Sequence, residues 1–256
     1  MKGTYCSMEG FARMDGHIPP DRHADALNSL RPIIDASPDR PFVVAQLGQS
    51  LDGRIATVTG ESKWINRSCA LDHLHSLRAA VDAVVVGVGT VVADDPMLTV
   101  RRVPGHHPAR IVIDPSGRMP AGPHCMEDNG ARRFVIRAAA AATPDGADEI
   151  ILPATDGKIA PQDILDALFA RGMRRILIEG GATTISAFLQ AGALDRLHVL
   201  VAPLIIGSGK NGLTLSPVER LNMAIRPKTH IHPLDDGDVL FDCDLRNPTI
   251  GLPHGD

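Results

Sequence analysis

The chain has 256 residues, of which 44% are hydrophobic, and its formal net charge is −4. These values permit a sizeable core and argue against a protein that tracks nucleic-acid phosphates, which usually carries a concentrated basic patch. The four cysteines are scattered, no apolar run approaches the ~20 residues of a membrane helix, and no basic-then-apolar leader opens the sequence. We therefore expect a globular cytoplasmic protein without a membrane or nucleic-acid partner.

Residues 1–38 contain many turn-forming residues and no long apolar period, which predicts a weakly structured N-terminal extension with at most one short helix, at 24–30. Residues 39–256 form a second unit, in which short β-branched runs alternate with helix-length segments. The runs lie at 42–47, 83–87, 109–114, 132–137, 174–180 and 197–203, and the helical segments include 66–80 and 161–172. This alternation indicates an α/β fold whose mostly parallel sheet is flanked by helices on both faces.

The runs at 195–203 and 237–245 alternate more regularly between apolar and polar residues, which predicts an antiparallel edge of a mixed sheet. In the segment 66–80 the apolar residues recur with a helical period through Leu74 and Leu77. Arg78 lies at the rim of that stripe. It is either a surface arginine lying along apolar side chains or an arginine that turns its guanidinium into a cleft.

Two strands lead directly into glycine turns and then into probable helices. Gly87 and Gly89 follow the run at 83–87, and Gly180 and Gly181 follow the run at 174–180. Glycine permits close approach of a ligand to the backbone, and the N–H groups at a helix start favour an anion. Two such turns suggest a cofactor that carries phosphates, although each alone is also compatible with a plain strand-to-helix connection. Neither turn matches the GxGxxG or Walker pattern.

Three charged residues beside these turns are candidates for chemistry. Glu179 ends an apolar strand, where it is either a proton donor with a raised pKa or the partner of a nearby arginine. Asp94 and Asp95 precede a proline, so at least one of them is expected to shape a turn, and the other can act with Glu179 as an acid/base pair. Arg101 offers a fork for a substrate phosphate.

The histidine pairs at 73/75 and 106/107 lack the spacing and neighbouring ligands of a zinc site, so no metal site is predicted.

Seven segments appear in an order that resembles the reductase domain of riboflavin biosynthesis, the C-terminal half of RibD-type deaminase/reductases, which also occurs as a stand-alone pyrimidine reductase. They are SLDGRIA (50–56), GESKWI (60–65), the helix ending in LRA (77–79), GVGTVVADDPMLTVR (87–101), RIVID (110–114), ILIEGGATTISAFLQAG (176–192) and VAPLIIG (201–207). The resemblance covers residues 41 to about 245. It implies a dihydrofolate-reductase-like fold, NADPH as reductant and a homodimer.

The resemblance also implies a role for each matching position. The positions that hold substrate in the family are Gln46, Ser62, Arg78, Leu98, Arg101 and Glu179. The cofactor positions are Gly48, Trp64, Thr90, Asp94, Ser116, Gly180, Gly181, Ala182, Thr183, Thr184 and Ile185. The substrate would be a ribosylamino-pyrimidine 5′-phosphate, either 5-amino-6-(5-phosphoribosylamino)uracil or its 2,5-diamino form, whose ribose becomes ribityl. Glu179, and after it Asp94, would supply the proton that accompanies hydride addition.

Three departures from the family pattern keep alternatives open. Gln46 stands where fused enzymes usually carry a lysine, which leaves room for a pterin reductase acting on a dihydropterin. Pro115 separates Asp114 from Ser116, whereas many relatives have Asp-Ser there, so NADH is the alternative cofactor. No deaminase motif is present, so another protein is expected to deaminate the pyrimidine. A catalytically silent nucleotide-binding relative is the alternative of another class, and it would be expected to lose Glu179 or a glycine turn.

Overall fold

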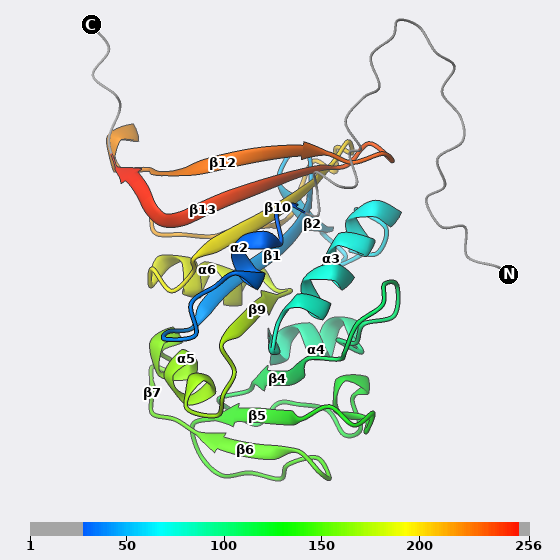
Figure 1. The fold of residues 1–256 in the computed structure, drawn as a ribbon, viewed down its shortest axis with the longest axis vertical. Coiled ribbons are helices and arrows are strands. Elements are labelled where there is room, and N and C mark those ends of the chain that lie inside the picture. The colour runs from blue at the N-terminus through cyan, green and yellow to red at the C-terminus, as the bar shows by residue number, and fades with distance from the viewer. Residues whose placement is uncertain (1–27, 251–256) are drawn as a thin grey trace, which may run out of the picture.

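The computed structural model describes residues 28–250, which are built around a nine-stranded sheet (Figure 1). In spatial order its strands are β12 (Ile225–Pro233), β13 (Val239–Ile250), β10 (Arg196–Ala202), β1 (Phe42–Ser50), β9 (Arg175–Glu179), β3 (Ala83–Gly87), β4 (Ala109–Ile113), β5 (Arg133–Arg137) and β6 (Asp148–Ile151). All neighbours from β10 to β6 are parallel, whereas β13 and β12 run antiparallel to their neighbours. The mixed, mostly parallel sheet that the sequence predicts is confirmed.

Helices cover both faces of this sheet. One core cluster contains residues of α2 (Arg31–Ile34), α3 (Ser68–Ala80) and α4 (Val88–Asp94), and the other contains residues of α5 (Pro161–Phe169) and α6 (Ala182–Gln190). Successive strand residues point to opposite faces, so Val43 lies in the cluster of α5 and α6 while Val44 lies in the other. The two-sided packing explains why the parallel strands read as continuous apolar runs.

The antiparallel pair β10–β13 is confirmed, but the expectation that it forms the edge of the sheet is wrong. The edge strand is β12, which pairs with β13. Its sequence did not read as a strand because it carries prolines and many exposed polar residues, which are typical of edge strands. The other strands that the sequence did not predict are β6, β2 (Arg54–Thr57), β11 (Gly209–Asn211), β7 (Ala154–Thr155) and β8 (Lys158–Ile159), while η1 (His124–Met126) and η2 (Leu221–Met223) are short 3₁₀ turns.

The segment before β1 contributes to the body of the molecule. Leu30 and Ile33 are buried in the core cluster that contains α3 and α4. The core of the molecule thus includes residues before position 38, where the sequence predicts a domain boundary. That domain division stays a prediction. Most of the helix expected at 24–30 lies outside the described residues. Among residues 28–250, no helix combines the length and apolar character needed to cross a membrane.

Candidate active site

The strand order places the two glycine turns next to each other. Strands β3 and β9 are parallel neighbours, so their carboxyl ends meet at one edge of the sheet. A Cβ atom on Gly87 would lie 2.5 Å from Thr184 Oγ1, and one on Gly180 would lie 2.9 Å from Thr90 Cγ2. The turn at Gly87 therefore packs against the beginning of α6, and the turn at Gly180 packs against the beginning of α4. This close approach, together with φ of +76° at Gly180, requires glycine.

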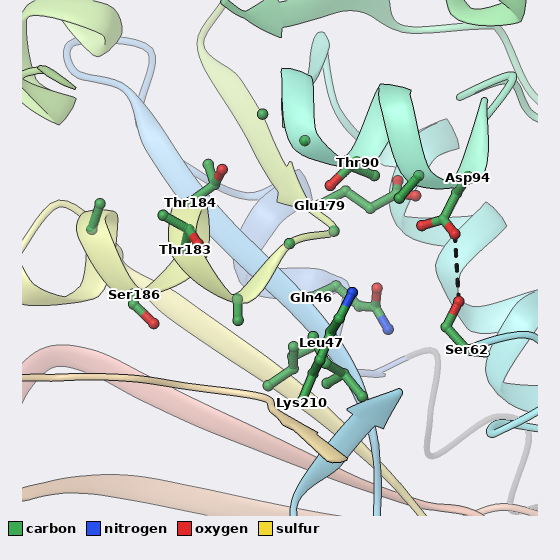
Figure 2. Close-up of a pocket in the computed structure, with 18 of the residues that line it drawn as sticks. Gln46, Leu47, Ser62, Thr90, Asp94, Glu179, Thr183, Thr184, Ser186 and Lys210 are labelled. Carbon is green, nitrogen blue, oxygen red and sulfur yellow. Dashed lines mark hydrogen bonds between the residues drawn. The ribbon is translucent and has the colours of Figure 1, made fainter. Parts of the chain in front are cut away.

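A cavity of about 1540 Å³ lies across the carboxyl ends of β1, β9, β3 and β4, and Figure 2 shows part of its lining. Its floor includes both glycine turns, and its sides come from the loop between β2 and α3, from the β7–β8 hairpin and from the paired strands β2 and β11. The predicted site residues that line it are Gln46, Gly48, Ser62, Trp64, Thr90, Asp94, Ser116, Glu179, Gly180, Gly181, Ala182, Thr183 and Thr184.

Four predicted site residues do not line the cavity. Ile185 and Leu98 are buried in the core, and Leu98 has a left-handed backbone with φ of +55°. Arg78 is also buried, so neither alternative for it, a surface arginine or one that opens into the cleft, is observed. Arg101 is exposed outside the cavity, and its Nη1 donates to Thr99 Oγ1 at 2.5 Å. The assignment of these four residues to ligand binding stays a prediction, and none of the four lines the cavity.

Glu179 forms a buried ion pair with Arg78. Arg78 Nε donates to Glu179 Oε2 at 2.8 Å, and its Nη2 donates to Oε1. The third nitrogen, Nη1, donates to the carbonyl oxygen of Thr99 at 3.0 Å. This is the arginine pairing that the sequence left as the alternative for Glu179. The ion pair fixes the Glu179 carboxylate at the cavity wall, beside the second glycine turn.

The two acids at the end of α4, Asp94 and Asp95, have different surroundings. Asp95 has a left-handed backbone with φ of +40°, accepts a bond from His124 N at 2.8 Å and pairs with the His124 ring. It is therefore the structural member of the pair. Asp94 instead faces the cavity, where Ser62 Oγ donates to its Oδ1 at 3.4 Å (Figure 2). Asp94 is solvent-accessible at the mouth of the cavity, across from Glu179.

Trp64 lies on the rim of the cavity in an unusual conformation. It is the single tryptophan of the sequence, its φ is +71°, and 83% of it is exposed. A left-handed backbone is costly for a bulky residue and often marks a functional segment. The segment from Gly60 to Asn66 thus holds a large aromatic surface open at the cavity mouth.

Four basic residues of the cavity were not predicted from the sequence. They are Lys63, Arg118, Lys158 and Lys210. Lys210 is the clearest case, because Figure 2 shows its side chain extending from β11 into the cavity toward Gln46. The β2–β11 pairing has an irregular register between Lys210 and Asn211, and such a bulge re-aims side chains. The only sequence signal was a lysine in the glycine-bearing stretch SGKNG (208–212), which follows the segment VAPLIIG.

The cavity can therefore hold an extended ligand with phosphates at the glycine turns and a reacting centre near the acids. Its described lining contains only two acidic side chains, Asp94 and Glu179, and both lie at the end formed by β9 and α4. Backbone N–H groups at the start of α6 and four cations complement negative charge elsewhere.

Comparisons with known proteins agree with this geometry. The family model of the RibD C-terminal domain matches residues 41–232. A relative from Methanothermobacter thermautotrophicus, named 2,5-diamino-6-ribosylamino-4(3H)-pyrimidinone 5′-phosphate reductase, is 37% identical over 69% of this chain and 83% of its own length. The riboflavin biosynthesis protein RibD of Aquifex aeolicus is 37% identical over 67% of this chain, which spans about half of that protein (49%). A structure of Acinetobacter baumannii RibD superposes with a TM-score of 0.71 at 28% identity, covering 88% of this chain and 63% of that one.

Proposed function

The chain belongs to the RibD C-terminal domain family, and from that membership we propose that it is an NADPH-dependent reductase of a ribosylamino-pyrimidine 5′-phosphate. The observation that carries the proposal is the pair of interlocked glycine turns beside an acidic cavity end. The curated relatives contribute the substrate class, because one of them is named for reduction of such a phosphate.

The residues at the glycine turns fit a dinucleotide. A Cβ at Gly87, Gly180 or Gly181 would fall within 3.0 Å of a threonine side chain, so the two turns can pack this closely beside the start of α6, where backbone N–H groups favour a phosphate, only while these positions are glycine. When bound, a reduced nicotinamide supplies hydride. Gly180 to Thr184 would hold the pyrophosphate, while Thr90 and Trp64 would border the nicotinamide end. The preference for NADPH is part of the proposal.

The substrate would lie at the acidic end, against Glu179, Asp94 and Ser62. Reduction of the imine bond in the ring-opened sugar adds hydride to the sugar carbon and a proton to the nitrogen. Because Glu179 already accepts two bonds from Arg78, we assign proton delivery to Asp94, which lines the cavity and is exposed to solvent. In this proposal Glu179, held in place by Arg78, orients the substrate at this end of the cavity.

A cofactor and substrate panel tests the proposed function. The intact protein is mixed with NADPH or NADH and with a ribosylamino-pyrimidine phosphate or a dihydropterin, and oxidation is followed at 340 nm. Turnover of the pyrimidine with NADPH supports the proposal, whereas turnover of the pterin alone or the absence of any dinucleotide binding overturns it.

Replacing Asp94 with Asn should slow single-turnover hydride transfer ~10²-fold or more, since proton donors contribute ~10²–10⁴-fold. An unchanged rate would show that Asp94 does not deliver the proton.

We also propose that a second copy of this protein packs on the β12 side of the sheet. Large apolar side chains are exposed on β12 and on the 3₁₀ turn before it, namely Leu221, Met223, Ile225 and Ile231. Clusters of this kind mark protein–protein contacts. Light scattering should give twice the monomer mass for the wild type and the monomer mass for Ile231→Glu; a monomeric wild type contradicts the proposal.

A further inference from the structure

The loop between β2 and α3, which carries Ser62 and Trp64 at the cavity, is held at its α3 end by a distant turn. That turn joins β12 to β13, and its last residue, Asp238, is fully buried. Asp238 Oδ2 accepts bonds from Arg67 N at 2.8 Å and from Asn66 Nδ2 at 3.1 Å. A turn in the antiparallel half of the sheet therefore holds one end of a loop that lines the cavity.

We propose that Asp238 is a positioning residue, which fixes the loop of residues 58–67 in the conformation that places Ser62 and Trp64 at the cavity. The inference rests on the proposed function, because it gives this loop a part in binding the cofactor. Asp238 does not itself line the cavity. It would act only through its bonds to Asn66 and Arg67.

The surroundings of Asp238 support this role. Within residues 28–250 its side chain makes only the two bonds to Asn66 and Arg67, and its Oδ1 is buried without a hydrogen-bond partner. Burying a carboxyl group costs free energy unless hydrogen bonds compensate for the lost water. In this turn, the compensating bonds are those that hold the loop.

Asn66 connects the same end of the loop to two further strands. Its Nδ2 also donates to the carbonyl oxygen of Leu200 on β10 at 3.2 Å. Its Oδ1 occupies the space that a Cβ on Gly48 of β1 would need, so the absence of a side chain at position 48 lets Asn66 pack on the strand. The α3 end of the loop is therefore fixed against β1, β10 and the β12–β13 turn.

The middle of the loop depends on its two ends. At the β2 end, Thr57 N donates to Glu61 O at 2.9 Å and Glu61 N donates to Thr57 Oγ1 at 3.1 Å. Between the ends, the described structure gives residues 62–65 one hydrogen bond, from Ser62 Oγ to Asp94 Oδ1 at 3.4 Å. Trp64 has a left-handed backbone with φ of +71°, which is costly for a bulky residue. Release of either end should therefore let this segment relax.

Hydrogen exchange measures the loop without any ligand. Asp238→Ala removes both bonds, so amide exchange of residues 58–67 should become about tenfold faster. Asp238→Asn keeps an oxygen that can accept both bonds, and its loop exchange should stay within about threefold of the wild type. Asn66→Ala removes one of the bonds and should give a smaller change in the same direction. This variant decides the question if Asp238→Ala does not fold.

Asp195→Ala is the matched control for loss of a buried acid. Asp195 is buried and likewise accepts one backbone and one side-chain donor, Val43 N at 2.8 Å and Arg40 Nη2 at 2.7 Å. These contacts lie at the amino end of β1, whereas the cavity lies at its carboxyl end. The control should lose stability as Asp238→Ala does and leave the exchange of residues 58–67 unchanged.

Trp64 reports whether the loop position affects binding, because it is the single tryptophan of the sequence. NADPH should quench its fluorescence, and the titration gives the Kd. This Kd should rise about tenfold in Asp238→Ala, since a loosened loop must be ordered on binding. It should stay within about twofold of the wild-type value in Asp238→Asn and Asp195→Ala.

The outcomes separate the inference from the proposed function. Unchanged loop exchange in Asp238→Ala and Asn66→Ala overturns the inference, and so does equal acceleration in Asp195→Ala, because the change would then follow general destabilisation. Faster exchange with an unchanged Kd of NADPH also overturns it, since the loop would be held without any effect on binding. If the wild type binds no NADPH, the proposed function fails, while the exchange rates still decide whether Asp238 holds the loop.

Discussion

The parallel and antiparallel halves of the sheet use polar residues in opposite ways. In the parallel half, the strand interiors are mainly aliphatic, and the groups proposed for chemistry lie at the carboxyl ends or just beyond them. In the antiparallel half, charged residues lie inside the sheet. Asp242 on β13 accepts two bonds from Arg196 at 2.8 and 2.6 Å, and His198 Nε2 lies 3.1 Å from the same carboxylate. His73 of α3 extends this network to His198 at 3.0 Å.

This contrast shows that a buried charge need not mark an active site. The network around Asp242 lies away from the cavity, and none of its members lines that cavity. It joins α3 to two strands through polar contacts where the parallel half uses packing between helices and aliphatic strands. We infer that the antiparallel half depends on this network for stability, while the glycine turns determine ligand binding.

Breaking the network should give the largest change in stability. Asp242→Asn removes the carboxylate that accepts two bonds from the buried Arg196 guanidinium and leaves only Asp244, at 3.6 Å from Nη1, so we expect a loss of about 3–5 kcal/mol of unfolding free energy. Asp72→Asn is the matched control, because its pair with Arg102 is partly exposed and should contribute less than about 1 kcal/mol. Urea denaturation measures both values. Similar small losses in the two variants would show that the buried network is not stabilising; the Kd of NADPH should be unchanged in each.

The second largest effect is expected at the glycine turns. Gly180→Ala introduces a Cβ at 2.9 Å from Thr90 and forces a left-handed alanine, whereas Gly192→Ala introduces the same strain with nothing within 4 Å. Strain costs about 1–2 kcal/mol at either site, and overpacking adds about 1–3 kcal/mol at Gly180 alone. Calorimetry should show at least tenfold weaker NADPH binding for Gly180→Ala and an unchanged affinity for Gly192→Ala. Equal NADPH affinities in both variants would contradict the proposal that the cofactor binds at the Gly180 turn.

The parallel half was largely predictable from the sequence, because its strands are continuous apolar runs and its turns are marked by glycine. Membership of the cavity was also predicted for most site positions, although their individual roles stay predictions. The edge strand β12 and the lysine on β11 were not predictable, since their positions depend on pairing between distant segments. The pairing of Arg78 with Glu179 was left open for the same reason: spacing in the sequence does not fix which side chains meet across 101 positions.

His75, a buried histidine of α3, should make the stability of the protein depend on pH. Burial, followed by the neighbouring Arg78 and Arg101 charges, lowers the pKa of His75 to about 3, and its Nδ1 accepts a bond from Arg101 N at 2.9 Å. Between that pKa and the ordinary histidine pKa of 6.5, the unfolded protein binds a proton that the folded protein does not. This contribution to stability is therefore complete above pH 6.5 and is lost on acidification, by about 2 kcal/mol at pH 5.

The His75→Gln variant retains a hydrogen-bond acceptor but cannot take up the proton. Its stability should therefore fall by about 2 kcal/mol less than that of the wild type between pH 7.5 and 5. Urea denaturation at four pH values measures the two slopes. His107→Gln, whose ring is exposed and accepts a bond from Val100 N at 3.1 Å, is the control. Parallel slopes for wild type and His75→Gln would exclude His75 from the acid response.

The smallest effect is expected from Lys210, the cation that β11 places in the cavity. Its ammonium lies 3.7 Å from the position of a Cβ on Gly60, at the start of the loop that bears Trp64. There it can meet an anionic oxygen of the substrate without touching the glycine turns. Lys210→Ala should raise KM for the phosphorylated pyrimidine about tenfold and leave kcat within twofold, because an exposed charge that orients substrate acts on ground and transition states alike. Lys210→Arg should restore KM; a tenfold fall in kcat at constant KM would instead place this lysine at the reacting atoms.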